Sequence, residues 1–170
     1  MAENRARLTI EVVRAVAAEI GAGRTGLRLS PEHGGQDAAE DVRADALATY
    51  GALLDGIAET GIAYLSVLHA DIDGDLVAEL RGRFGGAFLL NSGFGHVTDL
   101  AEAQHIVEDD RADAVVVGRE LIANPDLVRR WREGLPLNEP DQSTFYVSDY
   151  PFAASSESAA SSVSLSSTEV

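Results

Sequence analysis

The sequence contains no cysteine, and this absence excludes several kinds of chemistry at once. Disulfides, thiolate metal sites and cysteine nucleophiles all need a thiol. No apolar run approaches the roughly 18 residues that span a membrane, and residues 1–7 carry no apolar signal-peptide core. We therefore expect a cytoplasmic protein without a membrane partner.

Basic residues are also scarce. Lys and Arg number 13 against 28 Asp and Glu, which gives a formal net charge of -15. Binding to the phosphate backbone of DNA or RNA requires a basic face, so we expect no nucleic-acid partner. The chain of 170 residues is 45% hydrophobic and 24% charged, which is ordinary for one globular domain with a buried core.

Helical and strand patterns alternate along the chain. A helix over residues 8–20 is predicted to bury one apolar face, formed by Leu8, Val12, Val13, Val16 and Ile20. Four strand–helix units follow, with strands at 25–31, 62–68, 87–90 and 114–117 and helices at 46–57, 75–83, 99–108 and up to about 133. This alternation predicts right-handed βαβ units and a parallel sheet. Such units form either an open doubly wound sheet or about half of a (β/α)8 barrel, since a full barrel takes about 250 residues.

Two local predictions concern the end of the chain. Val115–Val117 is a β-branched run, typical of a strand covered on both faces, and Asn124-Pro125 is a pair that often caps and opens a helix. Residues 153–170 are rich in Ser and Ala and show no periodicity. We expect residues 1–152 to form the domain and residues 153–170 to be a disordered tail.

Candidate binding residues follow the predicted strands. Gly118 and Arg119 combine a bare backbone with a guanidinium where a strand passes into a helix, which suits a phosphate, although an isolated Gly-Arg pair is more often a tight turn. A glycine-rich turn around Gly93 follows the preceding strand, and barrels often bind phosphate after their last two strands. Arg28, after the first strand, would face the other end of the same ligand. The pattern suggests an elongated phosphorylated cofactor.

A metal site is not expected. His69, Asp71 and Asp73 alternate at one strand end, but a metal needs about three convergent ligands, and Asp73-Gly74 is typical of a turn. The remaining histidines show no ligand spacing and are expected at the surface: His33, His96 and His105.

Six motifs occur in the order found in one known family. They are Glu3-Asn4-Arg5-Ala6-Arg7, Gly26-Leu27-Arg28-Leu29-Ser30-Pro31, Ala63-Tyr64-Leu65, Asn91-Ser92-Gly93-Phe94, Val117-Gly118-Arg119 through Asn124-Pro125-Asp126-Leu127, and Pro136-Leu137-Asn138 with Thr144-Phe145-Tyr146. In this order and spacing the chain resembles the C-terminal half of Old Yellow Enzyme-type ene-reductases, FMN-dependent (β/α)8-barrel flavoproteins. The resemblance covers about residues 3–152 and implies a partial TIM barrel, strands five to eight.

The resemblance implies roles for individual residues. Arg28 would lie beside the N1/O2 edge of the flavin, where its charge stabilises the anionic reduced ring. Tyr146 corresponds to a tyrosine near the mouth of the family's substrate pocket. The FMN phosphate would be bound by the turns after the last two strands, with a serine in place of the family's first glycine: Ser92, Gly93, Phe94, Gly118 and Arg119.

The resemblance also implies what this chain lacks. The family's substrate-activating His/His or His/Asn pair, its proton-donor tyrosine and the Thr or Cys beside the flavin lie in the first half of the barrel, so no catalytic residue is assigned here. The implied reaction is hydride transfer from NAD(P)H to FMN and then to the β-carbon of an activated alkene. The alternative is a catalytically silent FMN-binding or assembly fragment. A half-barrel has open sheet edges, so we expect self-association, a separate partner half or poor stability.

Overall fold

The computed structural model describes residues 1–34, 39–93 and 95–145. Its helices are α1 (Ala2–Ile20), α2 (Arg43–Ile57), α3 (Asp75–Arg83), α4 (Leu100–Glu108), α5 (Arg119–Ala123) and α6 (Leu127–Glu133), with short 3₁₀ turns at Ala22–Arg24, Ala58–Thr60 and Gln142–Thr144. The strands are β1 (Gly26–Leu29), β2 (Tyr64–Leu68), β3 (Ala87–Asn91) and β4 (Ala114–Val115). The predicted order of one helix followed by strand–helix units is confirmed, and α3 has the predicted bounds.

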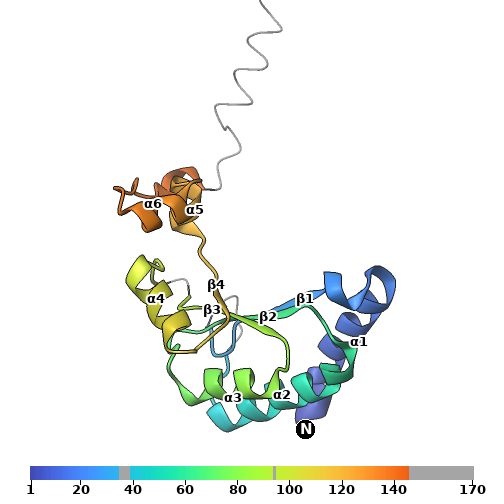
Figure 1. Cartoon of the computed structure of the whole chain (residues 1–170). Helices are drawn as coiled ribbons and strands as arrows, with labels where there is room; N and C mark the ends of the chain where they lie inside the picture. The colour runs from blue at the N-terminus through green and yellow to red at the C-terminus, as the bar shows by residue number, and fades with distance from the viewer. Residues whose placement is uncertain (35–38, 94, 146–170) are drawn as a thin grey trace, which may run out of the picture.

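The sheet is parallel throughout, with the strand order β1-β2-β3-β4. The connecting helices α2 and α3, together with α1, lie below the sheet in Figure 1, and α4 continues this layer at the left. A doubly wound sheet would carry helices on both of its faces, whereas a barrel carries them on its outer face only. Between the two predicted architectures, the structure therefore agrees with the half-barrel.

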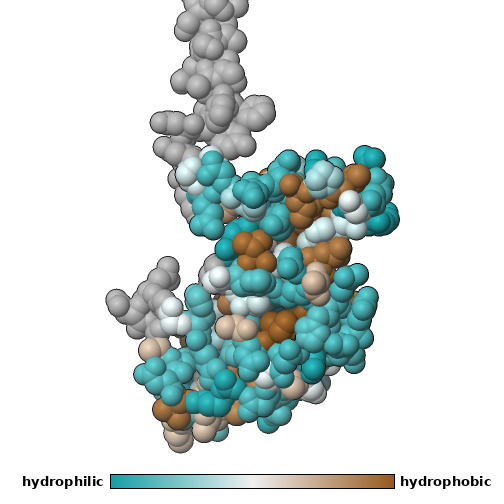
Figure 2. All heavy atoms as spheres, turned by 90° about the vertical axis from the view of Figure 1, so that its left-hand side faces the viewer, coloured by the Kyte–Doolittle hydropathy of each residue, from teal (hydrophilic) through white to brown (hydrophobic). Residues whose placement is uncertain are grey.

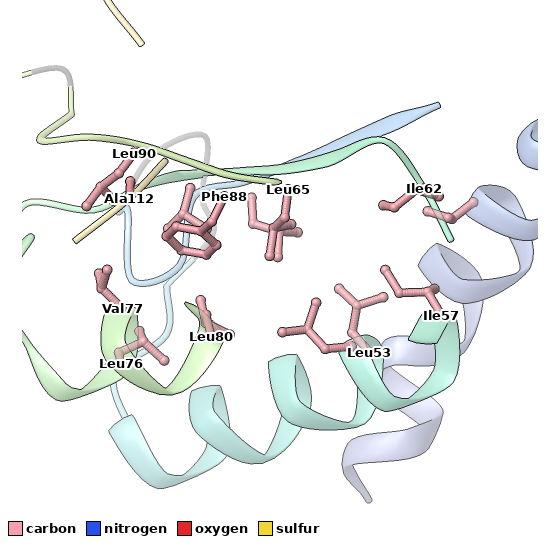
Figure 3. Packing of buried hydrophobic residues seen from close by; sticks show 14 of the residues in the cluster. Leu53, Ile57, Ile62, Leu65, Leu76, Val77, Leu80, Phe88, Leu90 and Ala112 are labelled. Carbon is pink, nitrogen blue, oxygen red and sulfur yellow. The ribbon is translucent and has the colours of Figure 1, made fainter. Parts of the chain in front are cut away.

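The core lies between the sheet and this helix layer. Strand residues on the layer's side are buried and apolar, among them Leu65, Phe88 and Leu90. They pack on the inward sides of α2 and α3, where Leu53, Ile57, Leu76, Val77 and Leu80 point toward them (Figure 3). The alternation along each strand places every second residue here, as expected for side chains with a period of two.

The other face of the sheet carries the residues between these positions. Arg28 is aligned with Ser66, and Leu68 with Asn91, across neighbouring strands. Polar and charged side chains on this face explain why β1 and β3 alternate in burial. The face that the helices do not cover therefore carries the polar and charged side chains that could bind a ligand.

Helix α1 packs closely on α2. Gly56 makes the approach possible, because a Cβ atom there would lie 2.4 Å from Cδ1 of Ile10. Arg14 donates a hydrogen bond of 2.5 Å to the carbonyl of Gly56, and Arg5 donates one of 2.8 Å to the hydroxyl of Thr49. These contacts fix α1 at one end of the helix layer.

The predicted buried face of α1 is mostly wrong. Val13 is buried together with Ala6 and Ala17. The other four predicted residues are exposed: Leu8 by 71%, Val12 by 52%, Val16 by 40% and Ile20 by 49%. The physical reason is position, because α1 ends the layer and, among the described elements, has extensive contacts only with α2 and the turn that follows α1.

The prediction for Val115–Val117 is also wrong. Strand β4 covers only Ala114–Val115, and the ladder extends by one further hydrogen bond, from the N–H of Val116 to the carbonyl of Leu90. All three valines are half-buried, not covered on both faces. In the described sheet β4 has a single neighbour, β3, so no second strand covers its other edge.

The predicted domain boundary at residues 152 and 153 lies outside the described residues, as does the predicted tail. Among the described helices, none combines the length and the apolar character needed to cross a bilayer.

Replacing Phe88 tests the core. Phe88 is 1% exposed, and Phe88→Ala should lower the free energy of unfolding by about 3–5 kcal/mol, because it removes buried apolar surface and leaves a cavity. Urea unfolding followed by circular dichroism measures this change. Val107, on α4, is 48% exposed, and Val107→Ala should stay within about 0.5 kcal/mol of the parent. Equal effects of the two substitutions would contradict the assignment of Phe88 to the core.

Acid should weaken the hydrogen bond that connects Phe88 of β3 to Asp113, in the turn before β4. The N–H of Phe88 donates to Oδ2 of Asp113 at 2.7 Å, and this bond, with Arg81 nearby, holds the pKa of Asp113 below its ordinary value of 3.8. A lowered pKa in the folded state means stability that is present above pH 3.8 and lost as the pH falls through the folded-state pKa. Thermal melts between pH 6 and pH 3 should therefore show a smaller acid-induced decrease in Asp113→Asn than in the parent. Identical decreases would refute this role.

Candidate functional site

The carboxyl ends of β1, β3 and β4 surround a pocket of about 550 Å³. It is lined by four of the residues predicted to bind the cofactor: Arg28, Gly93, Gly118 and Arg119. Leu68, Asn91 and Phe145 form part of the remaining wall. The predicted convergence of these strand ends in space is confirmed, while their binding of a cofactor stays a prediction.

Arg28 lies on the face of β1 that is turned away from the helix layer, and its side chain is exposed. Within residues 1–34, 39–93 and 95–145, no side chain or carbonyl forms a hydrogen bond or ion pair with its guanidinium. It also lines an adjoining pocket of about 700 Å³ between β1, α1 and α2. The structure thus leaves this cation available to an anionic or hydrogen-bonding ligand.

Gly93 follows β3 with φ at +108°, in the left-handed region that favours glycine. A Cβ atom here would also lie 3.2 Å from Cδ2 of Leu68, so the backbone reaches the pocket without a side chain in front of it. Next to it, Oδ1 of Asn91 is buried and has no hydrogen-bond partner among the described residues. A buried acceptor of this kind suits a donor group on a ligand.

Ser92 is placed differently from the prediction. Its N–H donates to Oε1 of Glu102 at 3.2 Å, so this donor is already used within the protein. Its side chain lines a neighbouring pocket of about 840 Å³, not the pocket beside Arg119. Ser92 therefore does not line the pocket beside Arg119, whereas Gly93 lines both pockets.

Glu102 holds the turn around Gly93, a role that its place in the sequence does not indicate. The start of α4 is capped by Asp99, whose Oδ1 accepts the N–H of Glu102 at 2.9 Å. The carboxylate of Glu102 does not return the bond but reaches Ser92, the hydroxyl of Thr98 at 3.4 Å and Nε2 of His96 at 2.9 Å. It therefore ties both ends of the turn that contains Gly93. An acid three residues after a cap gives the same sequence signal in either arrangement.

The segment after β4 fixes Arg119. Gly118 precedes α5, and Asn124 follows it with a fully buried side chain. The amide of Asn124 donates to the carbonyls of Glu120 and Asn138, each at 3.0 Å, and accepts the N–H of Asn138 at 2.7 Å. The prediction that Asn124 caps the next helix is thus wrong, because its side chain fastens α5 to the chain around Asn138.

A second polar cluster lies beyond β1 and β2. Arg43 donates from Nε and Nη2 to the two carboxylate oxygens of Glu32, at 2.5 and 2.7 Å, and Nε2 of His69 lies 3.2 Å from the same carboxylate. The Arg43 guanidinium is the main reason why the pKa of Glu32 lies below its ordinary value. Nδ1 of His69 is also engaged, 2.8 Å from the carbonyl of Asp71. The sequence reasoning did not foresee this cluster, which holds the loop after β1 in place.

The three residues considered for a metal do not converge. Asp73 pairs with Nε of Arg111 at 2.9 Å and with Nε2 of His105 at 3.1 Å, away from the His69 ring. In the part of the chain that the structure describes, no group of three or more His, Asp or Glu is arranged to hold a metal ion. Two predicted site residues, Phe94 and Tyr146, lie outside the described residues.

The pocket beside Arg119 fits a flavin nucleotide in chemistry and size. Two arginines, a glycine backbone and an unpaired amide oxygen suit a phosphate and the polar edge of a flavin. A volume of about 550 Å³ lies within the range of small-molecule sites.

Comparison with known proteins agrees with this geometry. Residues 1–138 match the model of the NADH:flavin oxidoreductase / NADH oxidase family. The chain belongs to this family. A 12-oxophytodienoate reductase-like protein of Solanum lycopersicum is 34% identical over 158 residues, which cover 88% of this chain and 42% of the relative. A probable flavin mononucleotide-dependent alkene reductase of Leishmania infantum is 37% identical over 163 residues, with the same coverage.

Solved structures of the family have the same fold. The old yellow enzyme from Trypanosoma cruzi is 33% identical with a TM-score of 0.75, covering 86% of this chain and 38% of that one. Morphinone reductase in complex with tetrahydroNAD is 38% identical with a TM-score of 0.76, covering 86% and 39%. The resemblance to the Old Yellow Enzyme family, a family that uses flavin and a nicotinamide reductant, and the partial barrel are confirmed. The chain spans about 40% of the length of these relatives.

Asn124→Ala should destabilise the segment that carries Arg119. Removing the buried amide leaves the N–H and carbonyl of Asn138 without their partner, at an expected cost of about 1–3 kcal/mol in the free energy of unfolding. Asn4 is exposed on α1 and provides the matched control, Asn4→Ala. Urea midpoints that coincide for the two variants would show that the Asn124 amide contributes no more than a surface residue.

Proposed function

We propose that this chain supplies the FMN-binding half of an ene-reductase of the Old Yellow Enzyme type. The observation that carries the proposal is the position of Arg28, Gly93, Gly118 and Arg119 around one pocket at the carboxyl ends of parallel strands. Family membership and an alkene reductase among the relatives support the choice of cofactor and reaction. FMN, when bound, supplies the hydride-carrying centre between NAD(P)H and an activated alkene.

The residues of this chain would bind and orient, and would not donate protons. Arg119 and the backbone of Gly93 and Gly118 would hold the phosphate at one end of the pocket. Arg28, which has no described partner, would place a positive charge beside the flavin ring and so stabilise its reduced form. Glu102 and Asn124 would keep the two turns in position through the contacts described above.

The second candidate is an FMN-binding or assembly fragment without turnover of its own. It is favoured by the coverage, because the chain matches only 38–42% of the relatives' length. Residues that activate the alkene and protonate the product would then come from the other half of the barrel. Both candidates require the same flavin pocket, and steady-state alkene reduction by the purified chain separates them.

Arg119→Ala tests the pocket that both candidates share. The purified chain is titrated with FMN and with riboflavin, and binding is followed by flavin fluorescence. Charge-assisted bonds are worth about 1.5–3 kcal/mol, so Arg119→Ala should weaken FMN binding about ten- to hundredfold and leave riboflavin binding unchanged. Arg132 is exposed on α6 and does not line the pocket, so Arg132→Ala should bind both flavins like the parent.

The outcomes separate the proposals. Loss of FMN affinity in Arg119→Ala alone supports the phosphate site, and turnover with NADPH and an activated alkene then supports the enzyme over the silent fragment. A parent chain that binds neither flavin refutes both candidates for the chain by itself. Equal losses for FMN and riboflavin refute the assignment of Arg119 to the phosphate.

A further inference from the structure

Asn91, the last residue of β3, has a side-chain amide that forms no hydrogen bond in the part of the chain that the structure describes. Its Oδ1 is buried, and the residue lines the pocket of about 550 Å³ together with Arg28 and Arg119. The backbone of Asn91 is fixed, because its carbonyl accepts the N–H of His69 at 3.1 Å. The amide is therefore held at the pocket wall without a partner from the described residues.

The surroundings of this amide are largely apolar. Leu68 is aligned with Asn91 on β2, and Val116, which is bonded through its N–H to Leu90 of β3, follows on the other side. Both line the pocket, as does Ile122 of α5. Seen from the α4–α6 side, brown surface interrupts the teal where α5 and α6 rise above the rest of the molecule (Figure 2). A polar group without a partner is unfavourable in such surroundings, so a ligand that bonds to the amide gains affinity from it.

Asn91 also lies between the two charged ends of the pocket. The strand order β1-β2-β3-β4 places it two strands from Arg28 and one strand from β4, the strand that precedes Arg119. Since neighbouring strands are about 4.8 Å apart, these separations across the sheet are about 10 Å and about 5 Å. Residues two apart along a strand share a face, so Asn91 faces the same way as Leu89, which is aligned with Arg28 through β2.

The proposed function gives the pocket a flavin-ring end beside Arg28 and a phosphate end beside Arg119. The ribityl chain joins these two parts of FMN and carries hydroxyl groups along its length. Because Asn91 lies between the two arginines, the ribityl chain is the part of the cofactor that comes closest to its amide.

A hydroxyl is also the group that best complements a side-chain amide. The amide offers two N–H donors and one acceptor oxygen, whereas a phosphate only accepts and a hydroxyl both donates and accepts. A half-turn of the amide exchanges its oxygen and nitrogen without changing its shape, so either atom can be directed toward the pocket. A hydroxyl bonds to whichever of the two atoms faces it.

We infer that Asn91 is a further cofactor-binding residue, whose amide bonds to a hydroxyl of the ribityl chain and so recognises the middle of FMN. The inference rests on the proposed function, because it requires a flavin in this pocket. It assigns the three polar side chains of the pocket to different parts of the ligand: Arg28 to the ring, Asn91 to the ribityl chain and Arg119 to the phosphate.

Asn91→Leu tests the inference, since leucine has a similarly branched side chain that cannot bond to a hydroxyl. The purified chain is titrated with FMN, riboflavin and lumiflavin, which has a methyl group in place of the ribityl chain, and binding is followed by flavin fluorescence. Asn91→Leu should weaken the binding of FMN and riboflavin about five- to twentyfold and leave lumiflavin within about twofold of the parent. Asn4 is exposed on α1 and does not line the pocket, so Asn4→Leu should bind all three flavins like the parent.

Unfolding of the flavin-free chain separates binding from a structural role. The Asn91 amide has no partner among the described residues, so replacing it with an apolar group should leave the urea midpoint equal to or above that of the parent. A lower midpoint together with equal losses for riboflavin and lumiflavin would show that Asn91 supports the fold, and would overturn the inference.

The other outcomes distinguish the inference from the proposed function. A parent that binds FMN, with an Asn91→Leu chain that binds all three flavins equally well, overturns the inference and leaves the proposed function standing. A loss confined to FMN assigns the amide to the phosphate, and a loss that includes lumiflavin assigns it to the ring, so either result also overturns the inference. A parent that binds none of the three flavins overturns both.

Discussion

The structure depends on the packing of a single sheet face against a single layer of helices. Leu65, Phe88 and Leu90 are almost completely buried there, and the inward residues of α2 and α3 complete the same core. Because these core residues all lie on the side of the sheet that faces the helices, the opposite face can carry Arg28, Ser66 and Asn91. The core thus determines the site indirectly, by fixing which face is free to bind a ligand.

The site itself is held in place by polar side chains to which we assign no contact with a ligand. Glu102 connects the turn after β3 to the start of α4, and Asn124 connects α5 to the chain around Asn138. Each of them is buried or nearly so. Asn124 makes its hydrogen bonds mainly to backbone groups, whereas Glu102 contacts one backbone N–H and the side chains of Thr98 and His96. Gly93 and Arg119 are consequently positioned by neighbours that would not be recognised as binding residues on their own.

Much of the fold follows from the sequence, and so does the grouping of the site. Helix α3 was predicted at its observed bounds because Leu76, Val77 and Leu80 mark one face between two turns. Arg28, Gly93 and Arg119 converge because strand ends of a parallel sheet share one edge. The failures have a common physical cause. Val12 and Val116 are apolar in the pattern of a buried residue, but burial depends on a neighbour, and a local pattern cannot show whether that neighbour is present. The amide of Asn124 illustrates a different limit, since its partner Asn138 is fixed only by the tertiary fold.

The strand order has a consequence for how the chain folds. Each strand of the described sheet pairs only with the strands that come before and after it in the sequence, and each crossover contains one α-helix. Contacts between strands are therefore separated by modest stretches of chain, and loop closure costs little entropy for each added unit. Growth can proceed one βα unit at a time, much as in repeat proteins, where a segment is stabilised mainly by its immediate neighbours. During synthesis, β1, α2 and β2 leave the ribosome before β4 has been made. These two strands can therefore already pair and pack against the helix.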